Sequence, residues 1–133
     1  MILLEDLEIY KLANEIGEEV WNLINEWNFF AKDTLGKQLT RAADSISLNI
    51  AEGYGRFHFK ENKNFCYYSR GSAYETKNGL LKALKRNLIS HEQHKQIFDK
   101  LELFSKKLNS YIKSIGKMEI QQININKDTI NDQ

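Results

Sequence analysis

The chain has 133 residues, of which 41% are hydrophobic and 28% are charged, and its formal net charge is +1. This length fits one domain, and this balance allows a buried core under a charged surface. The longest stretch without Asp, Glu, Lys or Arg is seven residues, from Ser45 to Ala51, which is too short to cross a membrane. Because the chain starts without a basic leader and Cys66 has no second cysteine, we expect a cytoplasmic protein.

Charge is distributed unevenly along the chain. Residues 1–33 hold eight acidic and two basic side chains, whereas residues 71–118 hold ten basic and four acidic ones. An acidic first helix beside basic later helices gives faces of opposite sign, which either attract a polyanion or pair subunits head to tail. Solvated helix surfaces without any partner are the third explanation.

Heptad spacing predicts the first two helices. Over residues 6–27 the apolar positions recur at steps of four and three: Ile9, Ala13, Ile16, Val20, Leu23 and Trp27. The second helix is predicted over residues 34–53, with the seam Leu35, Leu39, Ala42, Ile46 and then the polar Asn49. We expect Gly53 and Gly55 to end this helix, because glycine adopts the left-handed cap conformation at little cost.

The third helix is predicted over residues 60–87, and its inward positions are small. They are Ser69, Ser72, Ala73, Thr76, Gly79 and Ala83. Small side chains let neighbouring helix axes approach closely. Gly79 costs about 1 kcal/mol relative to alanine inside a helix, so we expect a packing reason for it.

Ser90 and Gln93 form a capping box that predicts the start of the fourth helix. Its seam runs Ile97, Leu101, Phe104, Leu108, Tyr111 and Ile115, and Gly116 is the expected stop. Residues 119–133 alternate isoleucine with Asn and Gln, and we predict a mobile polar tail there. The sequence has no proline, so residues 1–118 are predicted to form an all-α, antiparallel up-down-up-down four-helix bundle.

A row of polar side chains runs beside the apolar seam of the second helix: Arg41, Ser45, Asn49 and Glu52. Ser72 and Glu75 share a face on the third helix. We predict a structural polar network of Ser45, Asn49, Glu52, Ser72 and Glu75, with Arg41 or Arg56 balancing the carboxylates. The two carboxylates of this set, Glu52 and Glu75, are also suited to acid–base chemistry or to binding a metal. However, di-metal bundles use Glu-x-x-His pairs, and this sequence has none, so we predict no metal and no cofactor.

The same region resembles a bacterial protein family. The resemblance rests on Gln38-Leu39-Thr40-Arg41-Ala42-Ala43, Ser45-Ile46, Asn49-Ile50-Ala51-Glu52-Gly53, Gly55-Arg56, and then Phe65, Gly71-Ser72 and Glu75. These motifs resemble a family of four-helix bundles encoded within intervening sequences of 23S ribosomal RNA genes. The accessory proteins of diversity-generating retroelements are its relatives.

The resemblance covers residues 6–116, and it implies a homopentamer whose partner is an RNA or a reverse-transcriptase-like protein. Two positions depart from the family pattern. Thr40 stands where a second basic residue is common, which weakens the case for charge-driven nucleic-acid binding. Ser69 stands where the family tends to have alanine.

Basic side chains mixed with aromatic rings follow the polar row. Positive charge binds phosphate, and exposed rings such as Tyr67 and Tyr68 stack on unpaired bases. The candidate nucleic-acid-binding residues are Arg41, Arg56, Lys60, Lys63, Arg70 and Lys77. We therefore expect a non-catalytic oligomeric bundle that binds structured RNA, or a nucleic-acid–protein complex, through the basic surface of the second and third helices.

Two other functions stay open. Arg86 followed five positions later by His91 resembles the motif of HEPN-type ribonucleases, which act without a metal. This motif lies across the predicted turn between the third and fourth helices, where the two ends would splay apart, so we predict that the protein is not an enzyme. The other alternative is a structural adaptor that binds a protein such as a reverse transcriptase.

Overall fold

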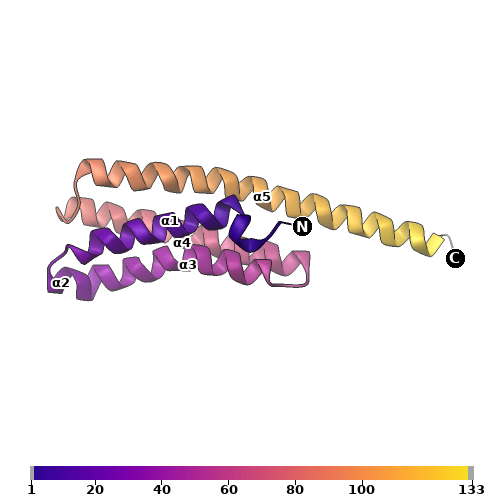
Figure 1. Cartoon of the computed structure of the whole chain (residues 1–133), viewed down its shortest axis with the longest axis horizontal. Helices are drawn as coiled ribbons and strands as arrows, with labels where there is room; N and C mark the ends of the chain where they lie inside the picture. The colour runs from indigo at the N-terminus through magenta and orange to yellow at the C-terminus, as the bar shows by residue number, and fades with distance from the viewer. Residues whose placement is uncertain (1, 132–133) are drawn as a thin grey trace.

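The computed structural model describes residues 2–131, and the elements over that range are all helical. In chain order they are the 3-10 helix η1 (Leu4–Asp6), α1 (Glu8–Asn25), α2 (Phe29–Ala31), the π-helix η2 (Lys32–Gly36), α3 (Lys37–Tyr54), α4 (Phe59–Lys85) and α5 (His91–Asn131). The four long helices lie side by side with alternating direction (Figure 1). Contacts join α1 to α3, α3 to α4, α4 to α5 and α5 to α1. The predicted antiparallel four-helix bundle is confirmed.

The apolar seams meet in one core, as the heptad spacing predicts. The buried seam residues are Ile9, Ala13, Ile16, Val20, Trp27, Leu35, Leu39, Ala42, Ile46, Ile97, Leu101, Phe104, Leu108 and Ile115. The predicted seam residues Leu23, Asn49 and Tyr111 are only half-buried. No helix in residues 2–131 is long and apolar enough to pass through a bilayer.

The predicted close approach of α4 to its neighbour is confirmed at two points. A Cβ added to Gly79 would lie 2.7 Å from Cδ1 of Leu39, so glycine lets α4 come close to α3. Nearby, the fully buried Ser69 donates a hydrogen bond of 2.7 Å from Oγ to the main-chain oxygen of Ile46. Small residues on α4 therefore leave room for α3, and the buried hydroxyl of Ser69 finds an acceptor on that helix.

Opposite charges join the first and last helices. Lys100 on α5 pairs with Glu19 on α1, and Nζ of Lys107 lies 2.7 Å from Oε2 of Glu8. The hydrogen bond from Lys107 and its positive charge lower the pKa of Glu8. Part of the uneven charge distribution is therefore neutralised by ion pairs within the chain, between the acidic α1 and the basic α5.

The predicted end of the fourth helix is wrong. α5 does not stop at Gly116 but continues to Asn131, and its last part extends beyond the bundle (Figure 1). A glycine costs a helix only about 1 kcal/mol, and no proline follows to force a break. Ile115 is the last buried residue of α5. Residues 119–131 are thus a helical extension rather than an irregular tail, and its mobility stays a prediction. Residues 132 and 133 of the predicted tail lie outside the described range.

The predicted left-handed glycine cap is also wrong. α3 ends at Tyr54, beside the predicted boundary, but Gly55 has φ −76° and no glycine in the described chain has a positive φ. Gly53 is instead a close-packing residue, because a Cβ there would lie 2.9 Å from Cβ of Phe65 on α4.

A left-handed residue does end α4, and it is an asparagine. Asn87 has φ 60°, which lets the amide of Leu88 donate to the Ala83 carbonyl at 2.9 Å. The predicted capping box then starts α5. The Ser90 amide donates to Oε1 of Gln93 at 2.9 Å, and the Gln93 amide donates to Oγ of Ser90 at 3.0 Å.

Candidate nucleic-acid interface

Three of the six predicted nucleic-acid-binding cations lie on the side of α4 that faces α5. Lys63, Arg70 and Lys77 follow one another at steps of seven, which places them on one face of the helix. Two of them are paired with α5. Nζ of Lys63 lies 3.0 Å from Oε2 of Glu119, and Nζ of Lys77 lies 2.6 Å from Oε1 of Glu102.

Two other predicted cations lie outside α4, one on α3 and one in the loop that follows α3. Arg41 lines a groove between α3 and α4 together with Glu75. Arg56 pairs with Oε1 of Glu52 at 2.7 Å, as expected for that carboxylate, and its guanidinium lies 4.9 Å from the Phe65 ring centre. The predicted basic surface is therefore divided between the α5 side of α4 and the α3 side of the bundle, and is not one continuous patch.

The sixth cation, Lys60, is exposed in the first turn of α4. The loop before it carries Phe57, which is 93% exposed and contacts only the edge of the neighbouring His58 ring among the aromatic pairs of the described chain. Phe59 packs partly against the core. Within residues 2–131, this corner thus presents a ring that is 93% exposed beside a lysine that forms no ion pair.

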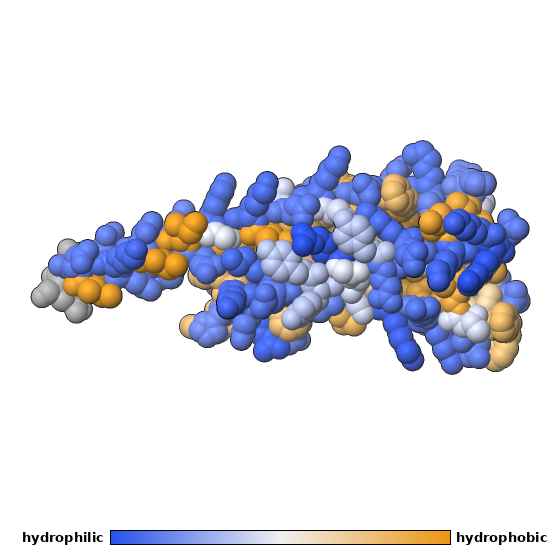
Figure 2. All heavy atoms as spheres, turned by 180° about the vertical axis from the view of Figure 1, so that it is seen from behind, coloured by the Kyte–Doolittle hydropathy of each residue, from blue (hydrophilic) through white to orange (hydrophobic). Residues whose placement is uncertain are grey.

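The most regular arrangement on the surface is an alternation of rings and cations along α4. Tyr67, Arg70, Tyr74 and Lys77 follow at steps of three, four and three, and we call this row the Tyr67–Lys77 stripe. The Arg70 guanidinium lies 4.9 Å from the ring centre of Tyr67, and Nζ of Lys77 lies 5.2 Å from that of Tyr74. Figure 2 shows pale rings beside blue charged side chains near the middle of the rear face.

An aromatic residue of α5 extends the stripe sideways. Nζ of Lys77 lies 5.5 Å from the ring centre of Phe98, and the Phe98 ring stacks on His94 with 5.8 Å between centres. The rings of Tyr67, Tyr74 and Phe98 are 43%, 65% and 38% exposed, so a flat ligand can reach them. Arg70 makes no ion pair within residues 2–131, and its charge is available to a phosphate.

Only part of this stripe was predicted from the sequence. The predicted residues include Tyr67, Arg70 and Lys77 but not Tyr74, although the three-four-three alternation of ring and cation is visible in the sequence. Phe98 could not be assigned to the stripe before the packing of α5 on α4 was known. Tyr68 lies on the other side of the helix, where its ring packs in a T-shaped pair with the ring of Phe65. The two ring centres are 5.4 Å apart.

The predicted structural polar row makes local bonds. Oγ of Ser45 donates to the Arg41 carbonyl at 2.7 Å, and Nδ2 of Asn49 donates to the Ser45 carbonyl at 2.8 Å. Within residues 2–131 no hydrogen bond joins Ser72 or Glu75 to this row. A network that closes across a subunit boundary stays a prediction.

The residues of the two enzyme-like arrangements are exposed on the surface of the described chain. Glu52 and Glu75 are both exposed, and residues 2–131 contain no cluster of three potential metal ligands. Arg86 caps the end of α4, whereas His91 is the first residue of α5, so the Arg–His motif lies across the interhelical turn.

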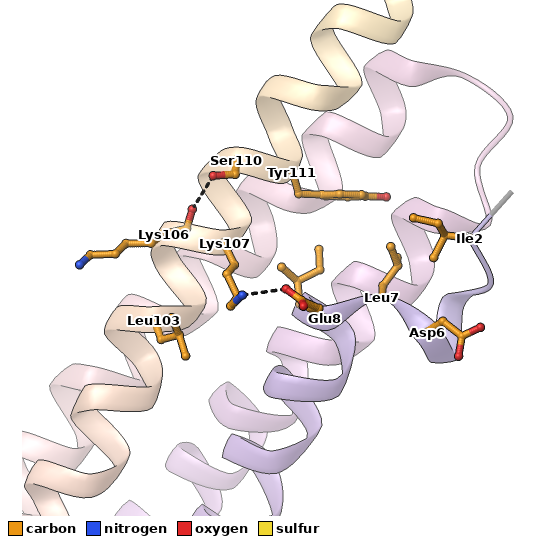
Figure 3. A pocket seen from close by; sticks show the side chains of 10 residues that line it. Ile2, Asp6, Leu7, Glu8, Leu103, Lys106, Lys107, Ser110 and Tyr111 are labelled. Carbon is orange, nitrogen blue, oxygen red and sulfur yellow. Dashed lines mark hydrogen bonds and ion pairs between the residues drawn. The ribbon is translucent and has the colours of Figure 1, made fainter.

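A groove of about 590 Å³ lies between the start of α1 and the middle of α5. Figure 3 shows Lys107 and Glu8 pointing towards each other across it, with Leu103 and Tyr111 on the α5 side. The residues that line the groove carry two acidic and two basic side chains, namely Asp6, Glu8, Lys106 and Lys107. This balance of charge, together with the internal ion pair, favours no ligand of a single sign.

These observations define a helical bundle with a mixed cationic and aromatic face on α4 and α5. The chain belongs to the 23S rRNA-intervening sequence protein family, whose model matches residues 5–110. The chain is also similar to a crystal structure of a protein of unknown function from the S23 ribosomal protein family of Bacteroides thetaiotaomicron. The TM-score is 0.71 with 24% identity, and the match covers 79% of this chain and 98% of that one. No curated protein matches the chain.

Proposed function

We propose that the protein is a non-catalytic RNA-binding bundle that holds unpaired bases on the Tyr67–Lys77 stripe. The observation that carries this proposal is the alternation of exposed rings and cations on one face of α4, with Arg70 over Tyr67 and Lys77 over Tyr74. The family's association with 23S ribosomal RNA supports a structured RNA with single-stranded loops as the ligand.

The geometry suggests how such an RNA is held. Bases stack on the exposed faces of Tyr67 and Tyr74, and each stacked base contributes about 1–3 kcal/mol. Arg70 binds a phosphate between them, while Lys77 remains paired with Glu102 and orients the Tyr74 ring. Stacking needs bases that are not in a duplex, so loops and bulges bind more tightly than continuous double-stranded RNA.

The test is a binding titration of a transcribed stem-loop from a 23S rRNA intervening sequence, followed by fluorescence anisotropy. We expect the double variant Tyr67→Ala/Tyr74→Ala to weaken binding at least tenfold. The matched control is Tyr68→Ala, because Tyr68 is on the same helix, is 58% exposed and turns to the other side. Equal binding by the double variant and the wild type would contradict the proposal.

A second comparison separates the α5 side of α4 from the α3 side of the bundle. Arg70→Glu should weaken binding and reduce its dependence on salt, because a phosphate contact releases a bound counterion. The charge reversal Arg56→Glu acts on the α3 side, and we expect it to leave the affinity within twofold. If only the Arg56 variant loses binding, the RNA lies on the α3 side, and the stripe is not the site.

Assembly is a further part of the proposal. The predicted homopentamer would use exposed apolar side chains such as Phe29, Phe30 and Leu48, which are 79%, 76% and 65% exposed. Light scattering coupled to gel filtration measures the number of subunits. A bundle that captures a reverse transcriptase while failing to bind any RNA would instead be a protein-binding adaptor.

A further inference from the structure

A second groove lies on the opposite side of the bundle from the Tyr67–Lys77 stripe. It has a volume of about 350 Å³ and lies where α1 meets η2 and the start of α3. In the ring of helices, the α1–α3 contact is across the bundle from the α4–α5 contact. We call it the Trp21 groove, after the large ring in its wall. Its volume is within the range of small-molecule sites.

Trp21 gives the groove an aromatic wall. It follows Val20, which is 1% exposed, but is itself 56% exposed, so the indole lies outside the core seam. The other tryptophan of the chain, Trp27, is buried. An exposed indole in a concave site offers a flat apolar face on which a planar ring can stack.

The π-helix supplies the floor of the groove. Gly36 ends η2 and is buried against α1, and a Cβ there would lie 3.0 Å from Cγ2 of Ile24. Because glycine has no side chain, η2 packs closely against α1 beside the groove. Such wide helical turns occur frequently at functional sites.

The polar lining of the groove is entirely cationic or neutral. Lys32 comes from η2, while Lys37 and Arg41 are four residues apart on α3, and none of the eight lining residues is acidic. Lys37 has a partner in Asp33 at 2.8 Å, but this pair is solvent-exposed and is therefore weak. Lys32 and Arg41 form no ion pair within residues 2–131. The groove thus has a positive potential of its own.

Two neutral groups complete the lining. Thr40 and Asn25 also line the groove, and neither side chain makes an intramolecular hydrogen bond in the described chain. They can donate to or accept from a ligand without losing an existing bond. As far as residues 2–131 show, one cavity is therefore lined by an aromatic ring, two cations without an ion pair and two polar side chains without a hydrogen bond.

We propose that the Trp21 groove binds a mononucleotide. The base stacks on the indole of Trp21, and the phosphate lies between Lys32 and Arg41, where the guanidinium can bind two phosphate oxygens. Thr40 and Asn25 are placed to bond the sugar or the base. The ligand is either a free nucleotide or the 5′-phosphorylated end of an RNA strand, since both present the same ring and phosphate.

Isothermal titration calorimetry of the full chain tests this assignment with AMP, adenosine and inorganic phosphate. We expect AMP to bind at least tenfold more tightly than adenosine or phosphate, because only AMP uses both the indole and the cations. No heat from AMP at millimolar concentration would overturn the proposal. A 5′-phosphorylated trinucleotide that binds more tightly than AMP identifies a strand end as the ligand, and the reverse order identifies the free nucleotide.

Variants locate the site. Trp21→Ala and Arg41→Gln should each weaken AMP binding at least fivefold, and circular dichroism checks that the exposed substitutions leave the fold intact. The matched controls are Tyr68→Ala, an exposed ring outside the lining, and Lys11→Gln, an exposed cation on α1. If Trp21→Ala binds AMP as the wild type does, the groove is not the site. The double variant Tyr67→Ala/Tyr74→Ala should retain AMP binding, which separates this site from the RNA stripe.

Discussion

Gly79 of α4 and Leu39 of α3 are in such close contact that a single added Cβ would lie 2.7 Å from the Leu39 Cδ1 atom. The two helices are therefore so close at this point that residue 79 has room for a hydrogen atom but not for a side chain. The contact explains a glycine in the middle of a 27-residue helix.

The first prediction concerns this contact. Gly79→Ala gains about 1 kcal/mol of helix propensity but forces Leu39 to move, and overpacking of this kind costs about 1–3 kcal/mol. The control is Gly71→Ala on the same helix, where an added Cβ meets nothing within 4 Å. Urea unfolding should show Gly71→Ala to be more stable than the wild type by about 0.5–1 kcal/mol and Gly79→Ala to be less stable. Equal gains for both variants would show that α3 and α4 are not tightly packed here.

The second prediction concerns the buried hydroxyl of Ser69. Ser69→Ala removes its hydrogen bond to the Ile46 carbonyl, and the loss should lower the free energy of unfolding by about 1 kcal/mol. Ser72→Ala is the control, because Ser72 is only half-buried and should change stability by less than about 0.5 kcal/mol. Thermal unfolding followed by circular dichroism compares the two variants. A Ser69→Ala protein as stable as the wild type would mean that the hydroxyl contributes nothing to the α3–α4 contact.

The third prediction concerns the extension of α5. Isoleucines of this segment are exposed, at 61% for Ile120 and 70% for Ile130, and Figure 2 shows orange, hydrophobic patches on the protruding end. A chain that ends after Met118 loses these residues and the ion pair between Lys63 and Glu119, in which both side chains are partly exposed. Its free energy of unfolding should fall by less than about 1 kcal/mol.

A shorter chain is the control for that truncation. Ending the protein after Lys113 also removes Ile115, which is 2% exposed, and loss of such a buried side chain costs about 2–5 kcal/mol. Urea unfolding of both chains measures the difference. If the two truncations are equally destabilising, the bundle needs residues 119–131, and its boundary is not at residue 118.

The fourth prediction concerns pH. Burial raises the pKa of the Cys66 thiol to about 11 from its ordinary value of 9.0. Between pH 9 and 11 the unfolded chain releases this proton while the folded chain keeps it, so stability falls as the pH rises through that window. Relative to Cys66→Ala, the wild type should lose up to about 2 kcal/mol across this range. Urea unfolding at pH 8 and pH 11 measures the loss, and parallel curves for the two proteins would contradict it.

The sequence determined the bundle because apolar spacing is a local property of a helix. Steps of four and three placed Ile16, Leu39 and Leu108 on inward faces, and the structure buries all three. The capping box of Ser90 and Gln93 was also readable, since both partners lie within one turn. The family motif in residues 38–56 was likewise visible without coordinates.

Only the tertiary structure decided which side chains share a surface and where α5 ends. Phe98 joins the Tyr67–Lys77 stripe, and Trp21 lines one groove with Arg41, only after separate helices pack together. Gly116 predicted a helix end from conformational preference, but that preference is worth about 1 kcal/mol and did not stop the helix. Spacing fixes which side of each helix points inward, whereas the side chains that share a groove depend on the positions of neighbouring helices.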